Sequence, residues 1–226
     1  GKRGDKVMQI NQFHSGTTVG DAITNMMLEL QELLTARGYE SEIYAEYIDE
    51  RLSGKIKPIE EYKGNKDNLL FVHHSMGMNC FDKIIGFPDR KALIYHNITP
   101  EHFFEDEGLK KAIRKGLWQA KEYRKYVEYS IADSNYNRKE LLGMGYENVD
   151  VMPIQISLDR FDHVLSEASV LEDHEKYKNI IFVGRVVPNK CQKDILHAFA
   201  VYNNFYNVDS RLFIVGDDGM EGYVNE

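Results

Sequence analysis

The sequence predicts a doubly wound α/β protein with parallel sheets, organised as two units of which the second is incomplete. Strand patterns alternate with helix patterns along the chain, and several strands are continuously apolar, as strands covered on both faces must be. The composition agrees, because 42% of the 226 residues are hydrophobic and 28% are charged, which is typical of a globular protein.

The first series of elements begins with a strand over residues 7–13 and a loop of turn formers over residues 14–21. Apolar residues then recur with helical spacing from Ile23 to Leu34, with Asp21 as the expected N-cap and Gly38 as the expected end. The rest of this series keeps the βα order. We expect strands over residues 41–45, 69–73, 92–96, 129–133 and 149–152, and helices over residues 106–127 and 137–143.

A polar, acid-rich stretch over residues 166–178 is typical of a linker between domains. We therefore expect a first domain over residues 1–165 and a second over residues 179–226. The second domain contains a strand over residues 179–184, a helix over residues 194–205 and a strand over residues 211–215. Two strands and one helix cannot cover both faces of a parallel sheet, so we expect this domain to be cut short.

Charge and cysteine content argue against several classes of protein. The chain has 36 acidic and 28 basic residues, and its net charge of −8 repels polyanions, which argues against nucleic-acid binding. Cys80 and Cys191 are far apart and fit neither a disulfide framework nor a thiolate metal site. The sequence has no run of 18 apolar residues and no signal-peptide pattern, so we expect a cytoplasmic protein.

The expected helix over residues 106–127 is strongly basic, although the protein is acidic overall. We favour a solvated helix face, whose long side chains cover apolar neighbours. The alternative is peripheral contact with an anionic membrane, such as the inner face of the plasma membrane. The basic residues are Lys110, Lys111, Arg114, Lys115, Lys121, Arg124 and Lys125.

Polar residues follow the ends of the expected strands, where ligands bind to open parallel sheets. These residues are His14 to Asp21, His73 and His74, His96 and Asn97, Asp133 and Ser134, and Gly184 and Arg185. Taken singly, His73 and His74 are interpreted as hydrogen-bonded structural residues. We interpret His96 as a ligand-facing residue, because the turn after it projects side chains over the sheet edge and histidine can donate to an anion or a sugar hydroxyl. The spacing of the histidines fits no metal site.

Two loops have the composition of phosphate-binding turns. Residues 16–20 are framed by Gly16 and Gly20 before a helix, although they match neither GxGxxG nor the P-loop, and a plain strand-to-helix turn is the alternative. Residues 182–190 place Arg185 and Lys190 between a strand and a helix N-terminus, which suits a diphosphate whose charge grows as its bond breaks. Two solvated cations on a loop are the alternative there.

Several strings in this sequence, taken in order, resemble family 4 retaining glycosyltransferases with the GT-B fold, which consists of two Rossmann-like lobes. The segment Phe-Val-Gly-Arg-Val-Val-Pro-Asn-Lys at residues 182–190, with residues 194–199 and 212–217, is similar to the opening of that family's donor-binding lobe. Five further segments are similar to its acceptor lobe. They are residues 20–25, 38–45, 95–100, 132–134 and 151–154.

The resemblance implies transfer of a sugar from a UDP- or GDP-linked donor to a glycan or lipid-linked acceptor, with retention and without a metal or other cofactor. Synthesis of bacterial polysaccharides or cell-surface glycans is the implied setting. His96, Arg185 and Lys190 would be catalytic, and Gly184, Gly16 and Gly20 would join the two cations in binding the donor. The implied acceptor-side residues are Thr17, Thr18, His73, Asn97 and Ser134.

One departure from the family concerns the second lobe. In the family a later helix carries paired glutamates that contact the donor, and this sequence ends before such a helix. We therefore expect weak or absent transferase activity if the sequence is complete as given. Two alternatives stay open: a protein that binds a nucleotide-sugar or glycan without turnover, and a sugar phosphorylase or epimerase on the same fold.

Overall fold

The computed structural model describes residues 8–155 and 176–217. Its backbone contacts divide the chain into two units, which are described separately. The first comprises Gly1–Glu101 with Asp106–Ser157, and the second comprises His102–Glu105 with Leu158–Glu226. Most of the linker expected at residues 166–178 lies outside the described residues.

The first unit contains a seven-stranded sheet in which every neighbouring pair of strands is parallel. The strand order β3-β2-β1-β4-β5-β6-β7 reverses its direction of growth between β1 and β4, which places the switch point of a doubly wound fold at the carboxyl ends of these two strands. The predicted α/β class with parallel pairing is confirmed. The strands are β1 (Ile10–Thr17), β2 (Ile43–Ile48), β3 (Lys57–Pro58), β4 (Leu69–His74), β5 (Arg90–Tyr95), β6 (Tyr129–Ala132) and β7 (Asp150–Val151).

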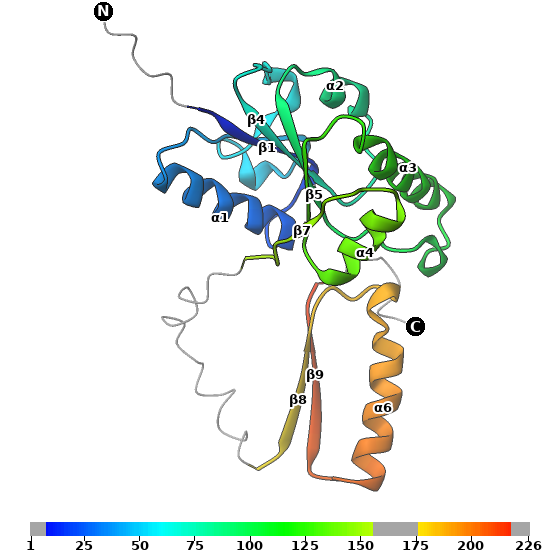
Figure 1. Cartoon of the computed structure of the whole chain (residues 1–226). Helices are drawn as coiled ribbons and strands as arrows, with labels where there is room; N and C mark the ends of the chain where they lie inside the picture. Colours follow the sequence, from blue (N-terminus) through cyan, green and yellow to red (C-terminus); the bar gives the residue numbers. More distant parts are fainter. Residues whose placement is uncertain (1–7, 156–175, 218–226) are drawn as a thin grey trace, which may run out of the picture. The chain divides into compact units, whose positions relative to one another are not determined.

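Helices cover both faces of this sheet. Crossovers between parallel strands are right-handed, so α1 lies on one face and the helices that follow β4, β5 and β6 lie on the other. Figure 1 shows α1 and α3 on opposite sides of the strands. The helices are α1 (Ala22–Ala36), α2 (Phe81–Gly86), α3 (Glu107–Tyr123) and α4 (Asn135–Gly143), with short 3-10 helices η1 (Glu50–Leu52), η2 (Ile59–Glu61) and η3 (Glu101–Phe103).

The first helix follows the predicted capping pattern. The Asp21 carboxylate accepts a hydrogen bond from the Thr24 amide at 2.9 Å, and the chain leaves the helix at Gly38, whose φ of +87° suits glycine. The buried face of α1 presents Met27 to a core cluster beneath β2. The other members of that cluster are Ile43, Ala45, Leu52 and Ile56.

The first strand is longer at its carboxyl end than the sequence indicated. His14, Gly16 and Thr17 were expected in a loop, but β1 pairs with β2 as far as Thr17 opposite Ile48. The hydrogen bonds of the parallel ladder therefore override the turn preference of these residue types. The turn before α1 shrinks to residues 18–21, and Gly16 lies in a strand.

Other differences are smaller. The helix expected to reach residue 127 ends at Tyr123, because the amides of Tyr126 and Val127 both turn back to the Tyr123 carbonyl before the chain enters β6. The short elements α2 and β3 were not predicted, since six and two residues carry too little periodic signal.

The basic residues lie on α3 and, for Arg124 and Lys125, just after it, and several of them are paired with acids. Lys110 lies 2.8 Å from Glu107, Arg114 lies 2.6 Å from Glu101, and Lys125 lies 2.7 Å from Glu122. These pairs agree with a solvated helix face, and the membrane interpretation stays untested. None of the described helices is long and apolar enough to cross a bilayer.

Between residues 176 and 217, the second unit contains β8 (Lys178–Val183), η5 (Pro188–Lys190), α6 (Gln192–Phe205) and β9 (Ser210–Val215). The two strands are parallel, with Ile181 opposite Phe213 and Val183 opposite Val215. All four of these apolar side chains are exposed. One face of the small sheet is therefore uncovered among the described residues, as expected of two strands with a single helix.

Candidate functional site

The carboxyl edge of the seven-stranded sheet gathers four buried histidines. Among the described residues, His14 lies near the end of β1, His73 and His74 end β4, His96 follows β5, and all four are buried. Burial of polar groups is costly unless each finds a hydrogen-bond partner. The partners therefore decide what this edge can do.

Three of the strands are joined by a chain of hydrogen bonds through His73. Its Nδ1 lies 3.0 Å from Nε2 of His96, and its Nε2 lies 3.0 Å from Oε1 of Gln12. Gln12 in turn donates from Nε2 to the Met27 carbonyl of α1 at 2.9 Å. The prediction that His73 is a hydrogen-bonded buried residue is confirmed, but its partner is the histidine that was singled out for ligand contact.

A carboxylate faces the other side of His96. Oδ2 of Asp133, which directly follows β6, lies 3.5 Å from Nδ1 of His96. Burial raises the pKa of the Asp133 carboxyl, but hydrogen bonds and charge from His96, Asn137 and Ser134 outweigh it and leave the pKa below its ordinary value. Asp133 is therefore ionised at neutral pH. Ser134 also caps α4, since its hydroxyl accepts from the Asn137 amide at 3.1 Å.

The remaining two histidines are neutral and hydrogen-bonded. Burial lowers the pKa of His14 and of His74 to about 4. His74 donates from Nε2 to the Gly116 carbonyl at 2.8 Å, which confirms its predicted structural role. His14 donates from Nδ1 to the Gly16 carbonyl, so its Nε2 accepts the hydroxyl proton of Ser75 at 2.9 Å. The Ser75 oxygen thus keeps its lone pairs for other partners.

The turn between β1 and α1 is already filled by the protein's own groups. The Val19 amide donates to Oδ2 of Asp49 at 3.2 Å, and the Thr18 amide donates to Oγ1 of Thr24 at 3.2 Å. Gly20 has φ of +86° and permits this turn. Thr17 is buried and donates to the Tyr47 carbonyl at 3.3 Å. A phosphate at this turn would have to displace the Asp49 carboxylate.

In the second unit, two glycines bring the ends of β8 and β9 together. The Gly184 amide donates to the Val215 carbonyl at 2.9 Å, and a Cβ on Gly216 would collide with the Gly184 carbonyl oxygen. Arg185 follows directly and is exposed, with its carbonyl accepting from Gln192 at 2.8 Å. Lys190 is exposed on η5.

The backbone between these cations and α6 has an uncommon conformation. Cys191 caps the N-terminus of α6 with φ of +54°, a left-handed value that is rare for residues other than glycine. This residue turns the chain from η5 into α6. Arg185, Lys190 and the α6 N-terminus therefore all lie in the segment that follows the carboxyl end of β8.

The structure thus places the predicted site residues in two groups. His73 and His96 contact each other at the carboxyl edge of the large sheet, where Ser134 follows β6, and Asn97 is exposed beside them. Gly184, Arg185 and Lys190 lie in the second unit. Sequence reasoning missed Gln12 and Ser75. Two polar residues, Asn11 and Gln12, between Ile10 and Phe13 of the first expected strand were the signal for Gln12, whereas nothing in the sequence marked Ser75.

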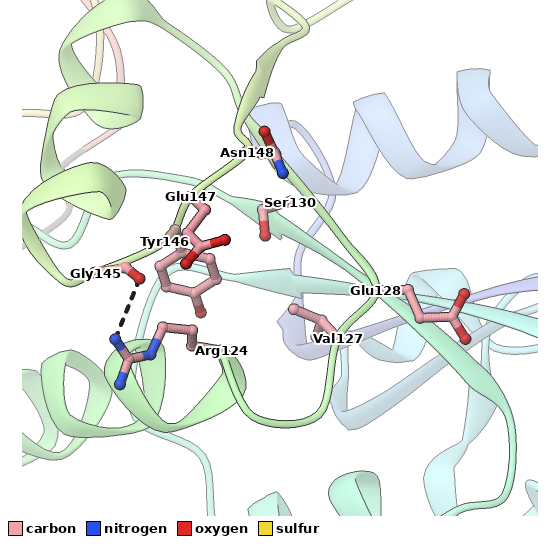
Figure 2. A pocket seen from close by; sticks show the side chains of 8 residues that line it. All are labelled: Arg124, Val127, Glu128, Ser130, Gly145, Tyr146, Glu147 and Asn148. Carbon is pink, nitrogen blue, oxygen red and sulfur yellow. Dashed lines mark hydrogen bonds between the residues drawn. The ribbon is translucent and has the colours of Figure 1, made fainter.

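A hollow of about 380 Å³ lies at the opposite end of the sheet, where the chain enters β6. Figure 2 shows Arg124 directed toward the Gly145 carbonyl, which it reaches at 3.2 Å. The lining residues are Arg124, Val127, Glu128, Ser130, Gly145, Tyr146, Glu147 and Asn148. None of the four buried histidines lines this hollow. Within the described residues, no cluster of three or more potential metal ligands occurs.

Comparison with known proteins finds similarity to solved structures. No protein-family model and no curated protein matches the chain. A solved structure of an alpha-glucosyltransferase in complex with UDP and a 13-mer DNA containing a central A:G mismatch is similar, with a TM-score of 0.40 and 11% sequence identity. The match covers 96% of this chain but only 58% of that one. A likeness this distant carries no weight for function, which must be judged from the residues of this chain.

Proposed function

We propose that this chain belongs to a glycosyltransferase of the GT-B type that uses a nucleotide-sugar donor without a metal and retains the anomeric configuration. The first unit would take a glycan or lipid-linked acceptor, and the second would begin the donor site. Support comes from the order of the motifs along the chain and from the doubly wound sheet, whose carboxyl edge carries the polar cluster.

The observation that carries the proposal is the segment after β8. It brings a guanidinium and an ammonium to the carboxyl end of a parallel strand, next to the N-terminus of a helix. A departing nucleoside diphosphate gains negative charge as its bond to the sugar breaks. Arg185 can hold two phosphate oxygens with its fork, Lys190 adds a point charge, and the α6 amides add a positive dipole end.

The reaction needs little covalent participation from the protein. The acceptor oxygen bonds to the anomeric carbon as the bond from that carbon to the diphosphate breaks, and the acceptor proton passes to the departing phosphate on the same face. The protein then contributes position and charge. We place His96 beside the transferred sugar, and Thr17, Thr18, His73, Asn97 and Ser134 on the acceptor side. Of these, Asn97 and Thr18 are exposed. Participation of Gly16 and Gly20 requires Asp49 to move away from the Val19 amide.

Titration calorimetry with UDP and GDP, together with an assay of sugar-nucleotide consumption, tests the proposal. Replacing Lys190 with alanine removes one cation, and we expect nucleotide affinity or rate to fall by about a hundredfold. The matched control is Lys178→Ala, since Lys178 is also exposed but lies at the amino end of β8. Equal nucleotide affinity in both variants and in the unaltered chain would contradict the proposal. Binding without sugar consumption fits both the weak activity expected of the sequence as given and a nucleotide-sugar-binding protein.

A further inference from the structure

The hydrogen-bond chain around His96 runs between two groups that only accept hydrogen bonds. At one end is the Met27 carbonyl, and at the other is the ionised Asp133 carboxylate. Between them lie the amide of Gln12 and the rings of His73 and His96. Nδ1 of His96, which lies 3.5 Å from Oδ2 of Asp133, is buried and forms no hydrogen bond.

Counting protons along this chain gives an imbalance. The three hydrogen bonds need one proton each, and a fourth proton is needed if Nδ1 of His96 is not to direct its lone pair at the Asp133 carboxylate. The Gln12 amide supplies the proton for the contact with Met27. Its oxygen then only accepts, which leaves three contacts that depend on the two rings. Two neutral imidazoles carry one ring proton each and fill only two of those three. A neutral pair therefore leaves two acceptors facing each other at one buried contact, which is costly.

Reversing the direction in which these hydrogen bonds donate leaves the same shortage of one proton. If Gln12 were turned over, its oxygen would face the Met27 carbonyl, and the unfilled contact would move from Asp133 to that end. One additional proton fills every contact at once. The carboxylate at Asp133 can balance its charge, and His73 is the poorer place for it because burial and the neighbouring His96 and His14 hold the pKa of His73 well below the ordinary value.

We propose that His96 is an imidazolium, protonated on both ring nitrogens, with Nε2 donating to neutral His73 and Nδ1 facing Asp133. Gln12 and His73 are then positioning residues that fix the Nε2 proton, and Asp133 is the counter-ion. The titratable groups around His96 are His14, His73, His74 and Asp133. Of these, only Asp133 is charged at neutral pH, so the local field favours the cation.

The consequence is a buried ion pair between His96 and Asp133 at the carboxyl edge of the large sheet. Resting on the proposed function, this ion pair would hold the His96 ring in place at the edge where the first unit takes its acceptor. The protonation state itself does not depend on that function. It can therefore be tested without donor or acceptor.

Long-range nitrogen–proton NMR of the histidine rings in the full chain at pH 7 reports how many ring nitrogens of His96 are protonated. We expect two in the unaltered chain, and one in Asp133→Asn, because the counter-ion is removed. Asp82→Asn, on the exposed surface of α2, is the matched control and should leave both protons on His96.

A second variant tests the Gln12 end of the hydrogen-bond chain. Gln12→Met keeps the shape of the side chain but removes the oxygen that requires a proton from His73, so two neutral rings then fill the remaining two contacts. We expect His96 to keep only its Nδ1 proton. Gln31→Met removes another glutamine of the same region, one that donates to the Ser41 carbonyl at 2.7 Å outside this chain, and should change nothing at His96. A singly protonated His96 in the unaltered chain, or no change in either test variant, would overturn the proposal.

Discussion

The two ends of the large sheet differ in how they treat polar side chains. At the carboxyl end, His14, His73 and His96 are buried and hydrogen-bonded across β1, β4 and β5. At the amino end, the hollow beside β6 is lined by charged and polar residues, and the Arg90–Glu128 pair next to it is about half exposed. Burying polar groups is costly, whereas exposed charges cost little. The two ends of the sheet therefore differ in the free energy that their polar side chains cost, and the proposed site lies at the end where that cost is higher.

The largest expected loss of stability comes from the loop after β4, which packs against α3 at the carboxyl end of the sheet. A side chain at Gly77 would come 2.9 Å from the Gly116 amide nitrogen and would press on the Ala112 carbonyl, both of which belong to the α3 backbone. Backbone atoms cannot yield as side chains can, so we expect Gly77→Val to lower the free energy of unfolding by about 3 kcal/mol. Denaturant unfolding measures this loss.

A matched glycine provides the control for that substitution. Gly143, the last residue of α4, has open space where its side chain would lie. Gly143→Val should leave the unfolding midpoint nearly unchanged. Equal losses in the two variants would mean that the loop after β4 is not clamped to α3.

Acid should weaken the fold through the buried histidines. In the unfolded chain a histidine takes up a proton below about pH 6.5, whereas burial keeps folded His14 neutral until about pH 4. The unfolded state binds more protons between these values, so stability falls as the pH falls from about 6.5 to 4. For His14 alone, we expect a loss of about 2 kcal/mol between pH 7 and pH 5.

Replacing His14 isolates its share of this pH dependence. In His14→Asn the amide can still donate to the Gly16 carbonyl but no longer titrates, so the variant should lose less stability between pH 7 and pH 5 than the unaltered chain. His197→Asn alters an exposed histidine of α6 and serves as the control. If the unaltered chain and His14→Asn lose the same stability on acidification, the protonation of His14 is not linked to folding.

The smallest change in stability is expected at the amino end of the large sheet. The side chains of Arg90 and Glu128 are 47% and 48% exposed although they lie 2.8 Å apart, so solvent screens their attraction. We expect Arg90→Ala to leave the unfolding midpoint within measurement error at physiological salt. A clear loss of stability in Arg90→Ala would contradict the statement that exposed charges at the amino end of the sheet contribute little.

The sequence was a better guide to elements than to side-chain partners. Continuous apolar strands and helical spacing predicted the parallel sheet, α1 and α3, because these patterns follow from burial within a few residues of one another. The extension of β1 through Thr17 depends on pairing with β2, some 30 residues away, and local turn preference could not reveal it. Likewise, the link from Gln12 to His73 spans 61 positions and exists only once β1 and β4 lie side by side.

The most direct test is to map the binding of a panel of UDP- and GDP-sugars onto individual residues by NMR. We predict changes at the ring signals of His73 and His96 and at the backbone amides of residues 184–187 and 189–191, which would be reduced in Lys190→Ala. Changes confined to Gly145 and its neighbours around the hollow, with none at the histidines or after β8, would contradict the assignment of the functional site.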